Sequence, residues 1–356
     1  MRVERVALRD FRSYEHADVE LGDGLTIVHG PNGSGKTNLL EGLYFGCTGR
    51  SFRTANEREL VRFGASALRV TVRGADDDGP HELAVGFAPG QPKRLSADGA
   101  PVERLTDAPH RPLLAVFSPD RLGLVKGQPS VRRAHLDQLV AALWPLRAAT
   151  RRAYREALAQ RNALIGRVRA GRVAADALTP WNRTLAEAGI ALAADRVAAV
   201  ELIAARFATR AGELGLGGDV RLAYEQRSSA AGADDLARQL ESALEADLAR
   251  GYTTVGPHRD DLLLARDGRP LRLYGSQGEQ RLALLALLLA ERDALAAARG
   301  RPPLLLLDDV MSELDASRRA LLADELRAVG QAVVSATEAE HVPGAGRDDV
   351  AQVSTT

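Results

Sequence analysis

The sequence has a single cysteine, Cys47, in 356 residues, which excludes a disulfide framework. It also lacks a long hydrophobic run: the longest apolar stretch, residues 282–290, is far shorter than the roughly 18 residues of a membrane span. The first six residues include Arg2, Glu4 and Arg5, where a signal peptide would have an apolar core. These absences predict a cytoplasmic protein without a membrane anchor.

The chain has no net charge, because 47 lysines and arginines balance 47 aspartates and glutamates. A nucleic-acid site must therefore be a local basic patch. Aromatic residues make up only 4% of the sequence and do not interleave with the basic runs, which disfavours a base-stacking platform. Lysine occurs only at Lys36, Lys93 and Lys126, so the position of each is informative.

A glycine-rich loop lies between a short apolar run, residues 25–29, and a segment with a helical apolar period. The loop matches G-x-x-x-x-G-K-[ST] in full, in the strand-to-helix context of a phosphate-binding loop. Backbone N–H groups of such a loop surround phosphate oxygens, the lysine reaches the β and γ phosphates, and the hydroxyl coordinates Mg²⁺. The predicted ATP-binding residues are Gly30, Pro31, Asn32, Gly33, Ser34, Gly35, Lys36 and Thr37.

Two acids, Asp308 and Asp309, follow a second apolar strand, residues 303–307. In a P-loop ATPase, Asp308 would hold the metal together with Thr37, and Asp309 would polarise the attacking water. We therefore predict Lys36, Asp308 and Asp309 as catalytic residues. Asp308 lies 272 positions after Lys36, a separation that most P-loop kinases and GTPases do not have.

The composition changes between these two segments. Residues 67–117 read as short strands and turns, whereas residues 130–214 are rich in Ala, Arg and Leu with a 3.6-residue apolar period. We expect an α/β fold, in which a P-loop head carries an antiparallel β-layer and an inserted helical arm. The predicted boundaries are 1–130 and 216–340 for the head, 131–215 for the arm and 341–356 for a flexible tail.

A Gly/Ser turn opens another long helix at Ser276, upstream of Asp308. In one interpretation, the serine is simply a helix N-cap and has no further role. In this order of motifs, the turn also resembles the signature sequence of ATP-binding-cassette ATPases, whose helix N-terminus binds the γ-phosphate held by a partner subunit. The second interpretation adds Ser276 and Gly278 to the nucleotide site, and Asp315 resembles the D-loop residue of the same ATPases.

Several longer motifs are together similar to the RecF family of DNA replication and repair proteins, over residues 1 to about 340. They are LRDFRSY at 8–14, GPNGSGKTN at 30–38, SFRT at 51–54, FSPD at 117–120, GPHRDDL at 256–262, SQGEQR at 276–281 and LDDVMSELD at 307–315. The segments GPHRDD and DDVMSELD are specific to that family among SMC-like and Rad50-like ATPases. The resemblance implies an ABC-type, SMC-like ATPase head with a short helical arm, and it adds Asn38 to the nucleotide site.

The resemblance also implies a function. A member of this family would bind ATP and Mg²⁺, dimerise on single-stranded and double-stranded DNA, and act in recombinational repair of gaps. RecR and RecO would be partners, and RecA would be loaded downstream. An ABC transporter subunit or another P-loop enzyme is the alternative, although the sequence lacks the glutamine and the switch histidine of transporter-type cassettes.

Two positions bear on the rate of ATP hydrolysis. No glutamine ends the apolar run 113–117, so the γ-phosphate sensor is Ser118, Asp120 or Gln128, and the sequence does not choose among them. Asp309 stands where a catalytic glutamate is usual, and its carboxylate is one methylene shorter. We therefore expect a weak ATPase whose hydrolysis acts as a slow reset, and the resemblance to the RecF family implies that DNA stimulates it.

Basic residues in three runs are candidates for DNA contact. They are Lys93, Arg94, Arg132, Arg133, Arg151, Arg152 and Arg155. A run of charge on a helix is usually a solvated face, and that interpretation stays open beside neutralisation of DNA phosphates. His258 and Arg259 are, in the same way, either phosphate ligands or turn residues with internal partners.

Overall fold

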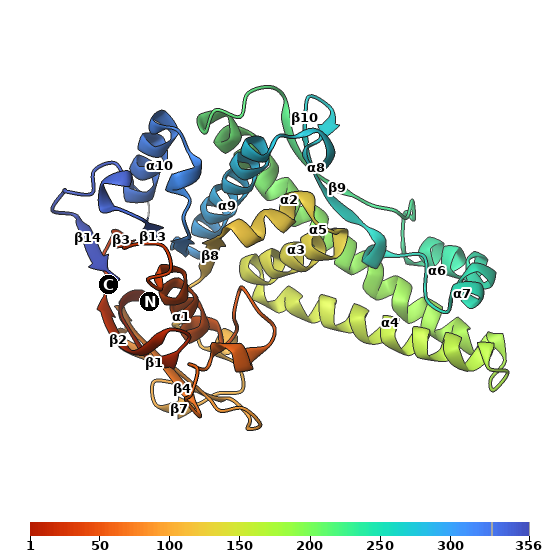
Figure 1. Ribbon diagram of the computed structural model, residues 1–356. Coiled ribbons are helices and arrows are strands. Elements are labelled where there is room, and N and C mark those ends of the chain that lie inside the picture. Colours follow the sequence, from red (N-terminus) through yellow and green to blue (C-terminus); the bar gives the residue numbers. More distant parts are fainter. Residues whose placement is uncertain (329, 356) are drawn as a thin grey trace. The chain divides into compact units, whose positions relative to one another are not determined.

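The computed structural model describes residues 1–328 and 330–355, except for the side chains of Pro119, Asp120 and Glu313. The chain forms two compact units (Figure 1): unit 1 comprises Met1–Arg121 with Arg299–Thr356, and unit 2 comprises Leu122–Ala298. Within the described ranges, no helix combines the length and the apolar character that crossing a membrane requires.

One sheet of unit 1 is antiparallel, with the strand order β2-β1-β4-β5-β6-β7. Its strands are β1 (Arg2–Phe11), β2 (Tyr14–Glu20), β4 (Leu68–Asp76), β5 (Gly79–Phe87), β6 (Arg94–Ala97) and β7 (Ala100–Pro101). Alternate residues of β1 and β4, such as Val6, Leu8 and Val70, are fully buried because successive side chains point to opposite faces. The predicted antiparallel β-layer is thus confirmed.

The second sheet of unit 1 is parallel, with the order β14-β3-β13-β12-β8. Its strands are β3 (Leu25–His29), β8 (Leu114–Phe117), β12 (Leu304–Leu307), β13 (Ala332–Ala336) and β14 (Val350–Ser354). Helix α1 (Lys36–Thr48) follows β3 and packs against strands of both sheets, and α10 (Ala316–Ala328) follows β12. Because the strands are parallel, the residues that follow them gather at one edge, the carboxyl edge.

Strand β14 differs from the flexible tail that the sequence predicted for residues 341–356. It pairs in parallel with β3, with Val350 opposite Leu25 and Ser354 opposite His29. The Thr355 N–H then donates to the His29 carbonyl at 2.8 Å. β14 is an edge strand of mixed burial, so its sequence carries no continuous apolar run.

Unit 2 is mainly helical. Its helices are α2 (Gly123–Lys126), α3 (Pro129–Leu143), α4 (Ala148–Arg169), α5 (Thr179–Glu213), α6 (Ala233–Ser242), α7 (Leu244–Arg250), α8 (Leu271–Tyr274) and α9 (Gln277–Arg299). A small antiparallel sheet has the order β11-β10-β9, with β9 (Val220–Glu225), β10 (Asp261–Arg266) and β11 (Arg269–Pro270). The long helices α4 and α5 pack side by side (Figure 1), as expected for a helical arm.

Unit 2 is larger than the predicted arm of residues 131–215. Residues 216–298, predicted from the sequence as part of the head, belong to unit 2 in the structure. The reason is packing: α6 and β9 both lie against α5, and Leu236 and Leu240 of α6 share a core with Leu185 and Leu192 of α5. A strand-like pattern in the sequence does not show which sheet, or which of the two units, the strand joins.

Candidate nucleotide site and basic surfaces

Three oxygen-bearing side chains meet at the carboxyl edge of the parallel sheet. The Thr37 hydroxyl of α1 donates to the carboxylate of Asp308, with both oxygens 2.9 Å away. The Ser335 hydroxyl of β13 donates to Asp308 Oδ1 at 2.7 Å. Carboxylate and hydroxyl oxygens are the donors that Mg²⁺ prefers. The predicted metal ligands Thr37 and Asp308, 271 residues apart, are therefore brought together.

The Asp308 carboxyl group is only 6% exposed. Burial raises its pKa, the hydrogen bonds from Ser335 and Thr37 act in the opposite direction, and the neighbouring charge of Asp309 raises the pKa further. A buried carboxylate of this kind is stabilised by a cation, because the cation compensates for the lost hydration. The residues present thus fit a divalent metal at this edge.

The glycine-rich loop places Lys36 close to its own backbone. Lys36 Nζ donates to the carbonyls of Gly30 at 2.6 Å and Pro31 at 3.0 Å. Gly35 has φ +105°, and a Cβ there would lie 2.9 Å from the Tyr14 hydroxyl, so only glycine fits. The Tyr14 hydroxyl donates to the Gly35 carbonyl at 3.1 Å, and burial raises the pKa of Tyr14 to about 12. Tyr14 therefore stays protonated and fixes the loop.

The C-terminal segment also contacts this loop. The hydroxyl oxygens of Thr355 and Ser34 lie 2.6 Å apart, and a Cβ on Gly30 would approach the Thr355 carbonyl oxygen to 2.4 Å. Thr355 could not be found from the sequence, because residues 341–356 lack a continuous apolar run and are predicted as a tail.

Asp309 has an unusual backbone conformation. Its φ is +51°, a left-handed value that aspartate and asparagine tolerate better than most residues. The Asp309 N–H donates to the Ser335 hydroxyl at 2.9 Å. Ser335 thus ties Asp308 and Asp309 together, and its signal in the sequence is a polar residue within an otherwise apolar strand.

A charged network supports the first turns of α1. Glu41 is fully buried and accepts two hydrogen bonds from Arg12, at 2.9 and 2.8 Å. Asn38, a predicted nucleotide ligand, donates to the Ser13 hydroxyl at 2.9 Å and accepts from Arg53 at 3.1 Å. Asn38 therefore has partners within the chain. Arg12, Ser13 and Arg53 belong to the motifs at 8–14 and 51–54, which carry no signal of this role in the sequence alone.

The three candidate γ-phosphate sensors have different surroundings. Ser118 follows β8 at the carboxyl edge and is 2% exposed, and its hydroxyl has no hydrogen-bond partner among the described residues. The side chain of Asp120 lies outside the described residues. Gln128 is exposed and precedes α3 in unit 2. Ser118 is thus the candidate that combines a place at the carboxyl edge with a buried hydroxyl to which the described residues give no partner.

The signature-like turn forms a helix cap. The Ser276 hydroxyl accepts from the Glu279 N–H at 3.3 Å, and the Ser276 N–H donates to the Glu279 carboxylate at 2.8 Å. This is a capping box at the start of α9, as the N-cap interpretation predicts. Gly278 is exposed, and Asp315 caps α10 by accepting from the Arg318 N–H at 2.9 Å. A role for Ser276, Gly278 and Asp315 towards a nucleotide stays a prediction.

The structure divides the candidate DNA-contact residues. Two have structural roles: Arg132 is 1% exposed and donates to Asp261 at 2.7 and 2.8 Å, and Lys93 pairs with Glu57. Burial in an ion pair removes Arg132 from the candidates, because its guanidinium cannot reach DNA.

Arg151 also has an internal partner, since its Nε lies 3.1 Å from the Asp137 carboxylate. Arg133 is half-buried and donates to the Asp260 carbonyl at 2.8 Å. The remaining candidates, Arg94, Arg152 and Arg155, are exposed, and the described residues give none of the three an ion-pair partner.

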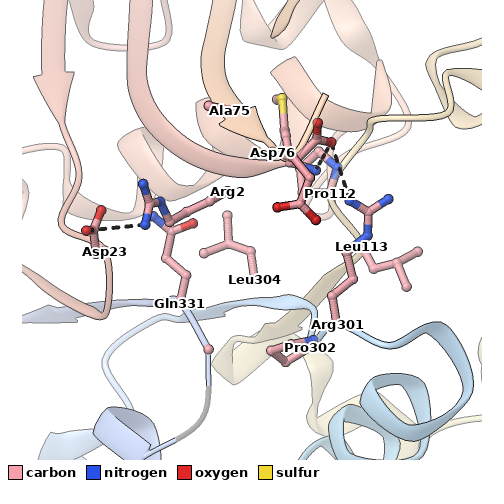
Figure 2. A pocket seen from close by; sticks show the side chains of 13 residues that line it. Arg2, Asp23, Ala75, Asp76, Pro112, Leu113, Arg301, Pro302, Leu304 and Gln331 are labelled. Carbon is pink, nitrogen blue, oxygen red and sulfur yellow. Dashed lines mark hydrogen bonds and ion pairs between the residues drawn. The ribbon is translucent and has the colours of Figure 1, made fainter. Parts of the chain in front are cut away.

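A cavity of about 470 Å³ lies at the opposite edge of the parallel sheet (Figure 2). Leu113, Leu304 and Gln331, which line it, stand at the amino ends of β8, β12 and β13. Ligands of open α/β sheets bind at the carboxyl ends of the strands. This cavity is therefore not the nucleotide site.

A cluster of metal-donor residues, Asp76, His81 and His110, lies beside this cavity in unit 1, with donor atoms within 4.8 Å of one another. Both imidazoles contact the Asp76 carboxylate, at 3.0 and 3.1 Å, and Arg301 lies 3.4 Å from it. The Met1 amino group lies 3.3 Å from the same carboxylate, so at least four nitrogen groups engage it, and the Arg301 guanidinium among them is permanently cationic. We assign no metal centre to this cluster.

Comparison with known proteins agrees with this architecture. A family model described as an AAA domain matches residues 5–83. A solved structure of the recombination mediator protein RecF-ATPrS in the RecFOR pathway is similar at a TM-score of 0.85 and 27% identity, over 98% of this chain and 93% of that one. An Smc head bound to the C-winged helix domain of ScpA shares the fold, at a TM-score of 0.60 and 16% identity, over 98% and 96% of the two chains. The predicted SMC-like head is thus confirmed.

A relative in sequence gives the family. The DNA replication and repair protein RecF of Anaeromyxobacter sp. (strain Fw109-5) is 42% identical over 363 residues, which cover 98% of this chain and 96% of the relative. Such identity over nearly the whole of both chains shows that this chain belongs to the RecF family of DNA replication and repair proteins.

Proposed function

We propose that the chain is an ATP-dependent DNA-binding protein of recombinational repair and a weak ATPase. The observation that supports this most directly is the meeting of the Lys36 loop, Thr37, Asp308 and Asp309 at one edge of the parallel sheet. That edge is where open α/β sheets bind phosphorylated ligands. The solved relative described as RecF-ATPrS supports ATP as the nucleotide.

In the proposed site, the loop N–H groups and Lys36 bind the phosphates, and Thr37 and Asp308 hold Mg²⁺. Bound Mg²⁺ would neutralise charge on the β and γ phosphates. Asp309 would accept the hydrogen bond of the attacking water, and Ser335 holds Asp308 and the Asp309 backbone in place. Ser118, with its free buried hydroxyl, is the proposed γ-phosphate sensor.

We further propose that ATP binding promotes dimerisation on single-stranded and double-stranded DNA. ATP hydrolysis would then release the dimer and reset the protein. The short Asp309 side chain is the reason we expect this hydrolysis to be slow. The RecFOR context of the solved relative supports RecR and RecO as partners. Loading of RecA at single-strand gaps is part of the same proposal. Because chromosomal DNA is the proposed substrate, the cytoplasm is the expected compartment.

The test is the ATPase rate of the purified protein with and without linear DNA. We expect measurable turnover with Mg²⁺ and a higher rate when DNA is added. A protein that binds ATP but neither binds DNA nor responds to it would favour another class of P-loop enzyme.

Ser118→Ala tests the sensor assignment. The described residues give the Ser118 hydroxyl no hydrogen-bond partner, so its removal should leave the melting temperature unchanged or slightly raised. Turnover should fall about tenfold or more if the hydroxyl contacts the reacting phosphate. Steady-state kinetics and thermal unfolding measure the two effects. Unchanged turnover would leave Ser118 without a role and direct attention to Asp120 and Gln128.

Asp309→Asn tests the proposed base. Asparagine also tolerates the left-handed φ of +51°, so the change removes the charge without new backbone strain. ATP binding should persist, and turnover should fall at least about tenfold. Equilibrium nucleotide binding and single-turnover hydrolysis distinguish the two steps. Wild-type turnover in this variant would point to a different base.

Arg152 and Arg155 lie on α4 and are exposed. Changing both to Glu should weaken binding to any DNA sequence and lower the log–log salt slope by about 0.9 for each lost phosphate contact. Fluorescence anisotropy at several salt concentrations measures both quantities. Arg183→Glu combined with Arg238→Glu, at exposed positions of α5 and α6, is the charge-matched control. If neither affinity nor slope changes, this part of α4 is a solvated face.

A further inference from the structure

Unit 2 contains a basic cavity of about 590 Å³ that is separate from the ATP site proposed above. Three arginines line it, Arg133, Arg227 and Arg259, and none of its described lining residues is acidic. Such a concentration of guanidinium groups is unfavourable without an anion, because like charges repel. The cavity therefore has the electrostatic character of an anion site.

The segment 256–261, from the family-specific GPHRDD motif, shows why Arg259 points to solvent. Gly256 has φ +129°, and a Cβ there would lie 2.7 Å from the Tyr154 hydroxyl, so the turn requires glycine. The His258 ring accepts from the Tyr154 hydroxyl at 2.7 Å and donates from Nε2 to the Thr253 carbonyl at 2.9 Å. His258 is thus a neutral positioning residue, and its burial lowers its pKa.

The acids of the same segment are also occupied. The Asp260 carboxylate accepts from the Tyr224 hydroxyl at 2.6 Å and from the Arg227 N–H at 2.8 Å, and Asp261 holds Arg132. Arg259 is the polar side chain of this segment to which the described residues give neither a hydrogen bond nor an ion pair. A turn in which every other polar side chain is bonded thus presents one free guanidinium.

Arg227 and Arg133 complete the charge. The Arg227 backbone is fixed on Asp260, while its side chain is exposed and has no ion-pair partner among the described residues. Arg133 donates through Nη1 to the Asp260 carbonyl, which leaves further N–H groups of its guanidinium. Burial, together with the charges of Arg196 and Arg259, lowers the pKa of Arg133. The positive charge of the arginines that line the cavity is therefore not fully compensated within the described residues.

The start of α3 contributes further donors. Pro129 and Ser130, in the first turn of this 15-residue helix, line the cavity. The N-terminus of a helix carries positive potential and free N–H groups, which favours a phosphate placed beside it. The hydroxyl of Ser130 adds a neutral donor of the kind that contacts DNA phosphates, whereas the Thr254 hydroxyl already donates to the Asp247 carboxylate at 2.6 Å.

We propose that this cavity is a phosphate-binding site that holds a backbone phosphate of DNA, with Arg227 and Arg259 as its direct ligands. The choice of DNA as the source of the phosphate rests on the proposed function. The site contacts no base in this assignment, so it contributes affinity without sequence preference.

The main test compares duplex binding by Arg259→Gln, Arg227→Gln and the double variant with wild type, using fluorescence anisotropy with ATP present. Each single change should weaken binding about tenfold, since a charge-assisted contact to phosphate is lost, and the double variant should lower the salt slope by about 0.9. Arg259→Lys should retain part of the affinity. Arg238→Gln, an exposed residue of α6 that pairs with Asp235, is the matched control and should bind like wild type. Melting temperatures check that all variants fold.

Calorimetric titration with inorganic phosphate separates DNA from a free anion as the source. Phosphate binding that the Arg259→Gln change removes, together with unchanged DNA binding, would show a site for a free anion and overturn the DNA assignment. Unchanged binding of both ligands in the double variant would overturn the site itself, while DNA-dependent ATPase activity of the wild type would leave the proposed function standing. A wild-type protein that binds no DNA would contradict the proposed function and the DNA assignment together.

Discussion

Replacing Lys36 with methionine should abolish ATP binding and leave the fold intact. Methionine has a similar length but no charge, and the charge-assisted contacts of a loop lysine to two phosphates should account for about a hundredfold or more in affinity. The fold should tolerate the change, because among the described residues Lys36 Nζ bonds only the carbonyls of Gly30 and Pro31, within its own loop. Binding of a fluorescent ATP analogue and thermal unfolding measure the two effects.

Lys126→Met provides the control. Lys126 is exposed at the end of α2 in unit 2, so its change removes the same charge from a surface position. It should bind ATP like the wild type. A Lys36→Met variant with wild-type affinity would remove the nucleotide-site assignment altogether, since no other lysine stands in a phosphate-binding motif.

Much of unit 1 could be predicted from the sequence, because its signals are local. The loop at 30–37 fixes a strand before it and a helix after it, and the alternating residues of β1 and β4 identify a half-buried sheet. β14 could not be predicted in this way. It is an edge strand whose partner, β3, lies more than 300 residues earlier, and its mixed burial leaves no periodic pattern.

The site was predictable where a motif fixes a residue type, and less so where a contact depends on tertiary pairing. Thr37 and Asp308 meet as expected, but Ser335 joins them only because β13 pairs beside β12. From the sequence, Arg132 is predicted as an exposed basic residue. In the structure it is buried in an ion pair with Asp261 and has a structural role. Charge patterns do not reveal burial, so the sequence alone does not separate exposed cations from those held in internal ion pairs.

The surface around Ser276 has the properties expected for the proposed ATP-dependent dimer. Ser276 and Gly278 are exposed at the N-terminus of a 23-residue helix, where positive potential suits a phosphate. Leu273 and Tyr274, just before this turn, are each 67% exposed. Large apolar side chains beside a polar turn are typical of a surface that another chain covers.

Ser276→Arg should therefore block ATP-dependent dimerisation and hydrolysis while sparing ATP binding. The larger charged side chain would fill the space that the partner's γ-phosphate needs, and it would also break the capping box with Glu279. Light scattering with and without ATP and Mg²⁺, together with turnover, measures the effect. Ser229→Arg, at an exposed serine of unit 2, controls for the added charge. A melting temperature close to that of wild type shows that loss of the cap has not unfolded the variant.

Mixing the Ser276→Arg and Lys36→Met chains distinguishes a shared site from two separate ones. In a mixed dimer with shared sites, one site combines the intact Lys36 of the first chain with the intact Ser276 of the second, and the other site carries both changes. Turnover should recover to at most about half that of the wild type, since one of two composite sites is functional. Sites built within single chains would each contain one defect, so the mixture would stay inactive. Monomeric wild-type protein at tens of micromolar with ATP, with and without DNA, would contradict the dimer before any mixing.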